Sequence, residues 1–167
     1  TRPALILEPG LAFGTGQHPT TRFLLDWLAM HPPVGKTVID WGCGSGILGL
    51  AALLLGAKSC LGTDTDPQAW AASRANARLN NVTFPVYPPD QLPESKVDLI
   101  LANILARPLM QLKSRFDAHL LPGGTLLLTG ILASQIPAME KTYAPDYTLT
   151  VETREKDWVL LTAIRQT

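Results

Sequence analysis

The fold of this chain is decided by the stretch Val38-Ile39-Asp40-Trp41-Gly42-Cys43-Gly44-Ser45-Gly46. Residues 37–39 are apolar and β-branched, which is typical of a buried parallel strand. Residues 47–55 are apolar and rich in alanine and leucine, which favour a helix. The stretch therefore predicts a strand, a tight glycine loop and a helix. A ligand can approach such a loop closely because glycine lacks a Cβ atom.

Two classes of nucleotide cofactor bind at such a loop. Residues 44–49 match the dinucleotide fingerprint G-x-G-x-x-G, which is typical of nicotinamide and flavin sites. Asp40, however, would place a negative charge beside the position of a pyrophosphate, and like charges repel. The spacing Asp-x-Gly-x-Gly-x-Gly favours a cationic ligand and resembles the glycine loop of class I S-adenosylmethionine-dependent methyltransferases. A glycine-rich turn that binds nothing is the third reading.

Length and charge indicate one soluble globular domain. The chain has 167 residues, of which 46% are hydrophobic, and its 14 basic and 14 acidic residues cancel. A balanced charge does not favour direct binding of nucleic acid, which uses clustered Lys and Arg. We therefore expect no nucleic-acid partner, and we expect a monomer.

Cysteine spacing and hydropathy point to an intracellular protein without a metal. Cys43 and Cys60 are the two cysteines, and their spacing predicts neither a disulfide framework nor a zinc site. No apolar run reaches the ~18 residues of a membrane span, and no signal peptide is visible. We therefore expect a cytoplasmic location, no membrane and no metal.

A second strand is predicted at residues 60–64, ending in Asp64. An acid at this position of a nucleotide-binding fold can accept hydrogen bonds from the ribose hydroxyls. Both cofactor classes contain a ribose, so this feature does not choose between them. Asp66 precedes Pro67 and is predicted to cap a helix over residues 67–80.

The rest of the chain continues the alternation of strands and helices. It predicts strands at residues 82–86, 97–102 and 125–129, an antiparallel hairpin at 147–155 and 158–164, and helices at about 19–31, 107–121 and 134–143. Residues 10–18 contain three glycines and form either an entry segment or a flap that closes over the cofactor with Phe13 as its apolar contact.

Two polar residues follow later strands. Asp90 follows the third strand and is a candidate hydrogen-bond partner of the adenine amine, although acidic residues are also common in turns. Asn103 ends the fourth strand, where ligands of open parallel sheets bind, and its carbonyl could orient an amine. A purely structural loop-capping asparagine is the alternative. His18 has two readings, proton handling and loop structure.

Four motifs together resemble one family, the bacterial ribosomal protein L11 methyltransferases. They are residues 10–21 (GLAFGTGQHPTT), 40–46 (DWGCGSG), 64–67 (DTDP) and 103–106 (NILA), of which the first and last are the specific ones. The resemblance implies a Rossmann-like class I methyltransferase, an α/β fold with helices on both faces of a mostly parallel seven-stranded sheet. It also implies methyl transfer from S-adenosylmethionine to lysine or N-terminal amino groups of a ribosomal protein.

By this resemblance, residues 1–17 are a linker segment, residues 18–167 are the methyltransferase domain, and the family's N-terminal substrate-recognition domain has no counterpart here. Asn103 is the expected catalytic residue. The expected cofactor contacts, from the motifs and the resemblance together, are Thr21, Asp40, Gly42, Gly44, Gly46, Asp64, Asp90 and Asn103.

Other functions stay open at this point. Nucleic-acid amino methyltransferases place prolines and an aromatic ring after the Asn, and the sequence Ile104-Leu105-Ala106 has neither. A small-molecule amino methyltransferase, a nicotinamide oxidoreductase and a non-catalytic binding module on the same fold are further alternatives.

Overall fold

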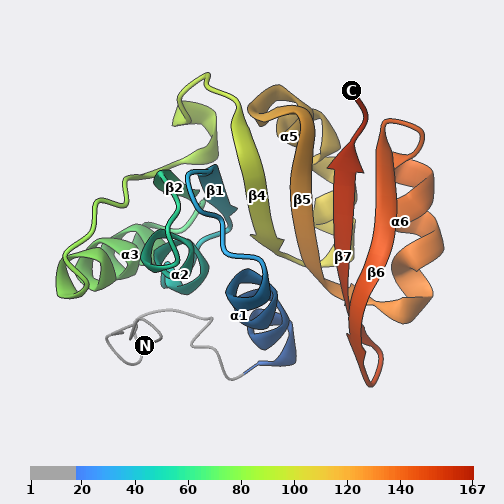
Figure 1. Cartoon of the computed structure of the whole chain (residues 1–167), viewed down its shortest axis with the longest axis horizontal. Coiled ribbons are helices and arrows are strands. Elements are labelled where there is room, and N and C mark those ends of the chain that lie inside the picture. The colour runs from blue at the N-terminus through green and yellow to red at the C-terminus, as the bar shows by residue number, and fades with distance from the viewer. Residues whose placement is uncertain (1–17) are drawn as a thin grey trace.

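The computed structural model describes residues 18–167 and contains one mixed sheet (Figure 1). Its seven strands lie in the order β3-β2-β1-β4-β5-β7-β6, with β1 to β5 parallel and β7 antiparallel to both of its neighbours. The predicted fold class is confirmed. Most of the motif at residues 10–18, including Phe13, lies outside the described residues.

The strands have the following bounds: β1 Thr37–Trp41, β2 Ser59–Thr63, β3 Val86–Tyr87, β4 Val97–Asn103, β5 Leu120–Leu132, β6 Tyr147–Glu155 and β7 Trp158–Arg165. The chain moves outward from β1 to β3, and then returns to add β4 on the other side of β1. The boundary between β1 and β4 is therefore the topological switch point, where parallel sheets bind ligands at the carboxyl ends of their strands.

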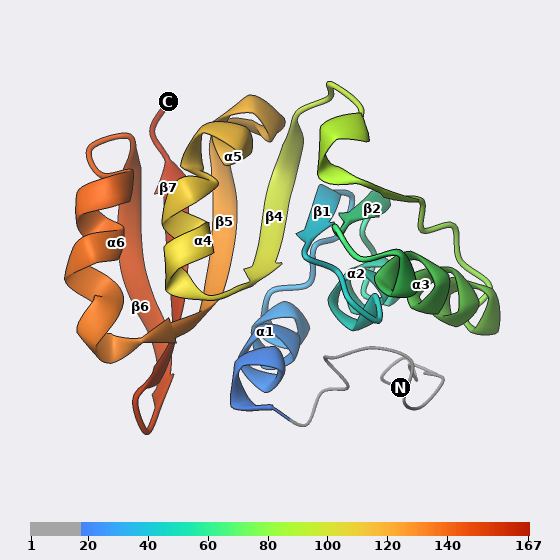
Figure 2. The same cartoon turned by 180° about the vertical axis from the view of Figure 1, so that it is seen from behind.

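Helices cover both faces of the sheet and enclose two hydrophobic cores. Helices α1 (Pro19–Met30), α2 (Ile47–Leu54) and α3 (Pro67–Leu79) contribute to one core. Helices α4 (Ala106–Gln111), α5 (Lys113–His119) and α6 (Ile136–Tyr143) contribute to the other, and Figure 2 shows them against strands β4 to β7. The short 3-10 helices η1 (Pro89–Gln91) and η2 (Ala133–Gln135) lie in connections.

Alternation along β1 assigns its side chains to the two cores. Val38 packs in the core of α1 and α2, whereas Ile39 and Trp41 pack in the core of α4 to α6. Successive residues of a strand point to opposite faces, so Asp40 faces α2. It is 1% exposed and lies within β1, which is longer than the predicted strand of residues 37–39.

The larger differences from the prediction concern three further elements. The third strand was placed at residues 82–86, but β3 is Val86–Tyr87, because Phe84 packs in the core against Gly49 and Gly62 instead of pairing. The helix predicted at 107–121 is two helices that meet at Leu112. The strand predicted at 125–129 is β5, and it begins earlier, at Leu120.

Candidate functional site

A cleft of about 560 Å³ opens at the carboxyl ends of β1 and β2, beside the segment that follows β4. This volume lies within the ~300 to 1,000 Å³ of typical small-molecule sites. The cleft combines apolar side chains with two acids and one cation. Its lining is Trp41, Gly42, Thr63, Asp64, Thr65, Pro89, Asp90, Ile104, Pro108, Leu112 and Arg115.

The amides of the glycine loop are used within the protein. Gly42 N and Cys43 N both donate to Thr63 O, at 2.8 and 3.0 Å, and Gly46 N donates to Cys43 O at 2.8 Å. Gly44 N donates to Asp64 Oδ2 at 3.0 Å. A pyrophosphate needs such amides to be free. The loop therefore lacks the donors of a dinucleotide site at these four positions.

Gly42 is required by the shape of the cleft. Its φ is +73°, a conformation that L side chains rarely adopt, and a Cβ there would lie 3.2 Å from Cγ1 of Ile104. Both residues line the cleft. A larger residue at position 42 would push Ile104 and narrow the hollow.

Asp40 lies beneath the loop and does not line the cleft. Its Oδ2 accepts a hydrogen bond from Gly49 N, in the first turn of α2, at 2.9 Å. Burial raises the pKa of this carboxyl to about 7, the Gly49 amide partly offsets that rise, and Asp64 adds to it. The carboxyl group thus accepts from Gly49 N, one of the amides at the helix N-terminus that a phosphate group would use.

Asp64 follows β2 and lines the cleft from its other side. Gly44 N donates to one carboxylate oxygen, and Asp66 N donates to the other at 3.0 Å. The indole Nε1 of Trp70 donates to Asp64 O at 2.7 Å. These bonds fix the carboxylate at the edge of the hollow. Asp66 caps α3 by accepting from Gln68 N at 2.9 Å, as predicted.

Asp90 lies in η1 and lines the cleft together with Arg115 of α5. Its side chain is exposed. Both residues also line a neighbouring hollow of about 610 Å³ between η1 and α5. An acid and a cation therefore stand at one margin of the cleft.

Asn103 and Thr21 are brought together although 82 positions separate them. Asn103 Nδ2 donates to Thr21 Oγ1 at 3.0 Å. Thr21 is in the first turns of α1 and is 0% exposed, whereas Asn103 ends β4 and is partly exposed. This bond leaves the carbonyl oxygen of Asn103 as its available acceptor. Neither residue lines the cleft directly, but Ile104, the residue after Asn103, does.

His18 serves as the N-cap of α1. Its Nδ1 accepts from Thr20 N at 3.3 Å and lies 2.7 Å from Thr20 Oγ1. Its ring meets Trp158 edge to face, with centroids 5.4 Å apart. These contacts favour a structural role for His18, the second of the two predicted readings.

Several lining residues were not predicted from the sequence. Trp41 could have been found from the alternation in β1, since Asp40 and Trp41 must face opposite sides. Arg115, Pro108 and Leu112 reach the cleft through the packing of α4 and α5, for which the sequence carries no local signal. Thr63 could have been found in the same way, because it pairs with Trp41 in the sheet and the side chains of paired residues lie on the same face.

The residues present fit a nucleoside that carries no phosphate. Asp64 offers the acceptor that a ribose needs, the loop offers no free amides at the positions above, and the lining is largely apolar. Thr63 also lines the cleft and is 0% exposed. Its Oγ1 has no hydrogen-bond partner among the described residues.

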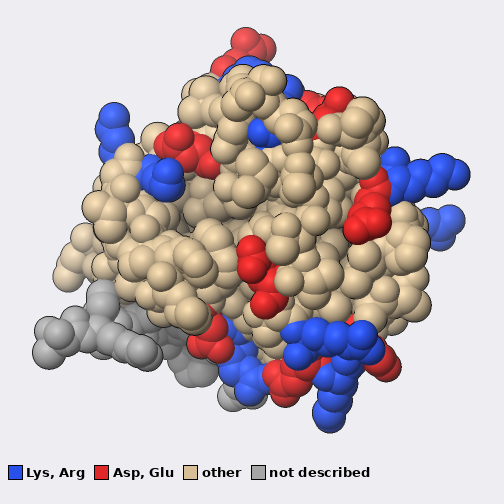
Figure 3. All heavy atoms as spheres, turned by 45° about the vertical axis from the view of Figure 1, so that its right-hand side comes forward, with Lys and Arg blue, Asp and Glu red and all other residues tan. Residues whose placement is uncertain are grey.

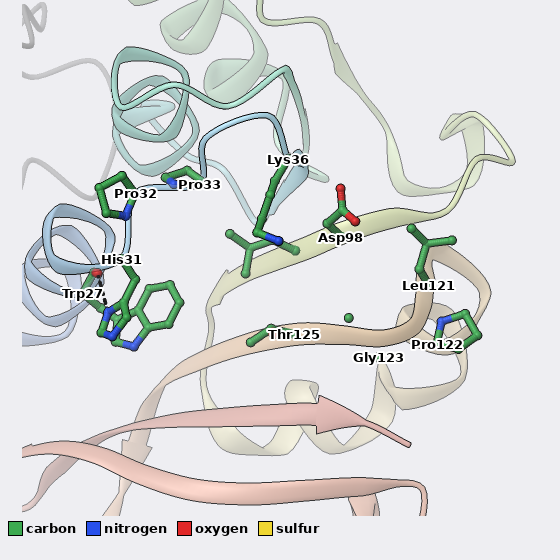
Figure 4. A pocket seen from close by; sticks show the side chains of 12 residues that line it. Trp27, His31, Pro32, Pro33, Lys36, Asp98, Leu121, Pro122, Gly123 and Thr125 are labelled. Carbon is green, nitrogen blue, oxygen red and sulfur yellow. Dashed lines mark hydrogen bonds between the residues drawn. The ribbon is translucent and has the colours of Figure 1, made fainter. Parts of the chain in front are cut away.

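A second cavity, of about 310 Å³, lies at the opposite end of the central strands, near the amino ends of β1, β4 and β5 (Figure 4). It is lined from the C-terminal end of α1 by Trp27 and His31, whose rings stack with centroids 4.4 Å apart. Lys36 and Asp98 line it at the amino ends of β1 and β4. It contains none of the predicted site residues, so it is not the candidate site.

Acidic and basic side chains are mixed on the surface. Figure 3 shows acidic and basic side chains interspersed on the face that it displays. The whole chain has equal numbers of each. This face offers no broad basic patch of the kind that binds nucleic acid.

The family follows from comparison with known proteins. A sequence profile described as "Ribosomal protein L11 methyltransferase (PrmA)" matches residues 2–166. The chain belongs to this family. Ribosomal protein L11 methyltransferases of Teredinibacter turnerae and Idiomarina loihiensis are 50% and 48% identical to it, over 97% and 96% of the chain. The chain spans 55% and 56% of the length of these two relatives.

Solved structures agree with this membership in the L11 methyltransferase family. The ribosomal protein L11 methylase of Lactobacillus delbrueckii subsp. bulgaricus matches with a TM-score of 0.88 at 35% identity, covering 98% of this chain and 86% of that one. The 16S rRNA N2 G1207 methyltransferase of T. thermophilus matches with a TM-score of 0.75 at 20% identity, covering 93% of this chain and 45% of that one. The second likeness shows a shared fold.

None of the helices in residues 18–167 has the length and apolar character that a membrane crossing requires. The same residues contain no cluster of three or more His, Cys, Asp and Glu side chains that could hold a metal ion. Cys43 and Cys60 are buried free thiols, and burial raises the pKa of both.

Proposed function

We propose that this chain is the catalytic domain of an S-adenosylmethionine-dependent protein methyltransferase that modifies amino groups of ribosomal protein L11. The observation that carries the proposal is the glycine loop, whose amides at four positions are bonded within the protein while Asp40 occupies the N-terminus of α2. A nucleoside without phosphates suits this loop, and a dinucleotide does not. Family membership supports the substrate.

The cofactor-holding residues follow from the cleft. Asp64 would accept from the ribose hydroxyls, and Asp90 would bond the adenine amine. Gly42 would allow the close approach of the nucleoside to the backbone. Gly44 and Gly46 would hold the loop, and Asp40 would support it from below through Gly49 N. Thr21 would act beside Asn103 at the reacting end.

S-Adenosylmethionine, when bound, supplies an electrophilic methyl group on a sulfonium. The protein must present the acceptor amine in line and without its proton. A lysine of pKa about 10.4 costs about 4.6 kcal/mol to deprotonate at pH 7, whereas an N-terminal amine of pKa about 7.7 costs about 1 kcal/mol. The Asn103 carbonyl would orient the amine by accepting one N–H. Positioning is worth up to ~7 to 11 kcal/mol in favourable cases.

Substrate capture is proposed to need more protein than this chain contains. The curated relatives are nearly twice as long as the part that the chain matches. We assign residues 18–167 to the methyltransferase domain and place substrate recognition in the remaining part of such proteins. A ribosomal substrate would place the reaction in the cytoplasm.

Thermal stability with added cofactor tests the proposal. S-Adenosylhomocysteine at 100 times its Kd should stabilise the chain by about 2.7 kcal/mol, and NAD at the same concentration should have no effect. When the chain is joined to the remaining part of a full-length relative, labelled S-adenosylmethionine should then transfer methyl groups to purified ribosomal protein L11. Stabilisation by NAD, or by neither compound, would contradict the proposed cofactor.

Two acidic residues provide a matched pair of variants. Asp64→Asn should weaken binding of S-adenosylhomocysteine about tenfold, since a hydrogen bond to a charged group contributes about 1.5 kcal/mol or more. Asp66→Asn should leave binding unchanged, because Asn caps a helix as well as Asp does. Equal affinities of the two variants would remove Asp64 from the ribose site.

A further inference from the structure

Thr63 ends β2 and has an unusual environment for a buried polar residue. It is 0% exposed, and its Oγ1 is one of three buried side-chain polar atoms that have no hydrogen-bond partner in residues 18–167. The other two belong to Trp27 and His119. Of the three residues, Thr63 is the one that lines the cleft of the glycine loop.

An unpaired buried hydroxyl destabilises a protein, because it loses its hydrogen bonds to water and gains none in return. Valine has nearly the same shape without the hydroxyl and is favoured in strands. Folding by itself would therefore favour valine at position 63. A residue that is unfavourable for stability at the floor of a binding cleft indicates a role in binding.

The position of Thr63 identifies the part of the ligand that it would meet. Its backbone carbonyl accepts from Gly42 N and Cys43 N, so the residue is fixed against the glycine loop. The next residue is Asp64, the ribose candidate, and Thr63 also pairs with Tyr87 of β3. The reacting end, at Asn103, lies at the end of β4, on the other side of β1.

We propose that Thr63 is a further cofactor contact, whose hydroxyl forms a hydrogen bond with the adenosine half of bound S-adenosylmethionine. This inference rests on the proposed function, because it presumes that the nucleoside occupies this cleft. It assigns a direct binding role to a residue that would otherwise belong to the core of the sheet.

The test compares Thr63→Val with the wild-type chain in two measurements. Without ligand, the variant should melt about 1 to 4 °C higher, because it buries no unpaired hydroxyl. Isothermal titration with S-adenosylhomocysteine should show affinity about three- to tenfold lower. The same loss is expected with 5′-methylthioadenosine, which keeps the adenosine and lacks the amino acid. Thr63→Ser, which keeps the hydroxyl, should bind like the wild type.

Thr162→Val is the matched control. Thr162 is also buried, at 4% exposed, but its hydroxyl is bonded to Glu152 Oε1 at 3.0 Å on the far strands β6 and β7. This variant should not melt higher, and its affinity for S-adenosylhomocysteine should equal that of the wild type.

The outcomes separate two kinds of failure. A wild-type chain that binds no S-adenosylhomocysteine would overturn the proposed function itself. A wild-type chain that binds, with Thr63→Val binding equally well, would overturn the role of Thr63 and leave the function standing. A Thr63→Val chain that melts lower than the wild type would show that the hydroxyl has a partner in the free protein, and it would also overturn the inference.

Discussion

At the scale of single residues, the polar groups of the site are arranged by partners far away in the sequence. Asn103 is the clearest case, because its amide nitrogen is held by Thr21 Oγ1 at 3.0 Å. Its backbone is fixed by pairing with Thr129, and Ile104 N donates to Thr129 O at 3.1 Å. Thr21 thus acts on the carbonyl of Asn103, the group proposed to receive the amine.

This arrangement predicts a shared effect of two substitutions. Asn103→Ala should lower turnover about tenfold or more, and Thr21→Val should lower it about two- to tenfold with a smaller change in affinity for S-adenosylhomocysteine. The double variant should be no slower than Asn103→Ala, because both changes remove the same interaction. Steady-state kinetics of the four proteins checks this. Multiplied losses in the double variant would mean that Thr21 acts independently.

The candidate site residues differ in how far they could be predicted from the sequence. Asp64 and Asn103 could be predicted because each follows a recognisable strand, and parallel strands end at one edge of the sheet. The contact between Asn103 and Thr21 could not be derived from spacing, since it depends on how α1 packs across the sheet. Arg115 was missed for a similar reason, because the position of α5 places it. These site assignments stay predictions until the ligand experiments are done.

At the scale of secondary-structure elements, one glycine decides where the segment after β4 can lie. Gly130 in β5 has φ +90°, and a Cβ there would lie 2.4 Å from Ile104 O. The two backbones therefore touch, which brings residues 103–105 against β5. The close approach coincides with a shift in the pairing of β5 with β7 between Thr129 and Ile131.

Gly130→Ala is expected to lower the free energy of unfolding by at least ~2 kcal/mol and to lower turnover, because the added methyl must displace Ile104 and with it Asn103. Gly35→Ala is the control, since Gly35 has a similar φ of +73° and open space around it. It should cost about 1 kcal/mol and leave turnover unchanged. Urea denaturation measures both. Equal losses in the free energy of unfolding for the two variants would show that the close contact of Gly130 with Ile104 does not determine the effect.

Helix and strand bounds were predicted correctly where neighbouring residues in the sequence mark them. The Pro19 start, the glycine loop and the Asp66 cap each gave a correct helix boundary. The break at Leu112 has no proline or glycine beside it, so no local sequence pattern predicted it. The third strand was predicted, but its bounds were wrong, because Phe84 within the predicted range packs in the core instead of pairing with another strand.

At the scale of the whole molecule, the mostly parallel seven-stranded sheet with an antiparallel C-terminal hairpin could be predicted, because the family resemblance and the two C-terminal strand patterns agreed. The sequence pattern could not predict how easily buried groups of the interior ionise. Asp40 is a buried acid, and the negative charge of Asp64 further disfavours its ionisation.

The stability of the ligand-free chain should therefore depend on pH through Asp40. Burial raises its pKa from 3.8 to about 7. Between pH 3.8 and about 7 the folded protein holds a proton that the unfolded chain has released. The contribution of Asp40 to the free energy of unfolding therefore falls as pH rises through this range, and it is constant above it. Asp40→Asn should remove the effect, since its carbonyl can still accept from Gly49 N.

The measurement is urea denaturation of both proteins at pH 5 and pH 8. Asp40→Asn should be more stable than the wild type at pH 8, by on the order of 1 to 4 kcal/mol, and the difference should shrink at pH 5. Subtracting the free energies of unfolding of the two proteins cancels the pH dependence that comes from the other carboxyl groups. A difference that does not change with pH would mean that Asp40 titrates alike in both states.

The place of β7 between β5 and β6 has a consequence for biosynthesis. Strand β6 pairs with β7, and β7 is made last of the seven, so the sheet cannot be completed while Trp158–Arg165 is still inside the ribosome. An enzyme proposed to modify a ribosomal protein would thus complete this sheet only after residues 158–165 have left the ribosome that made them.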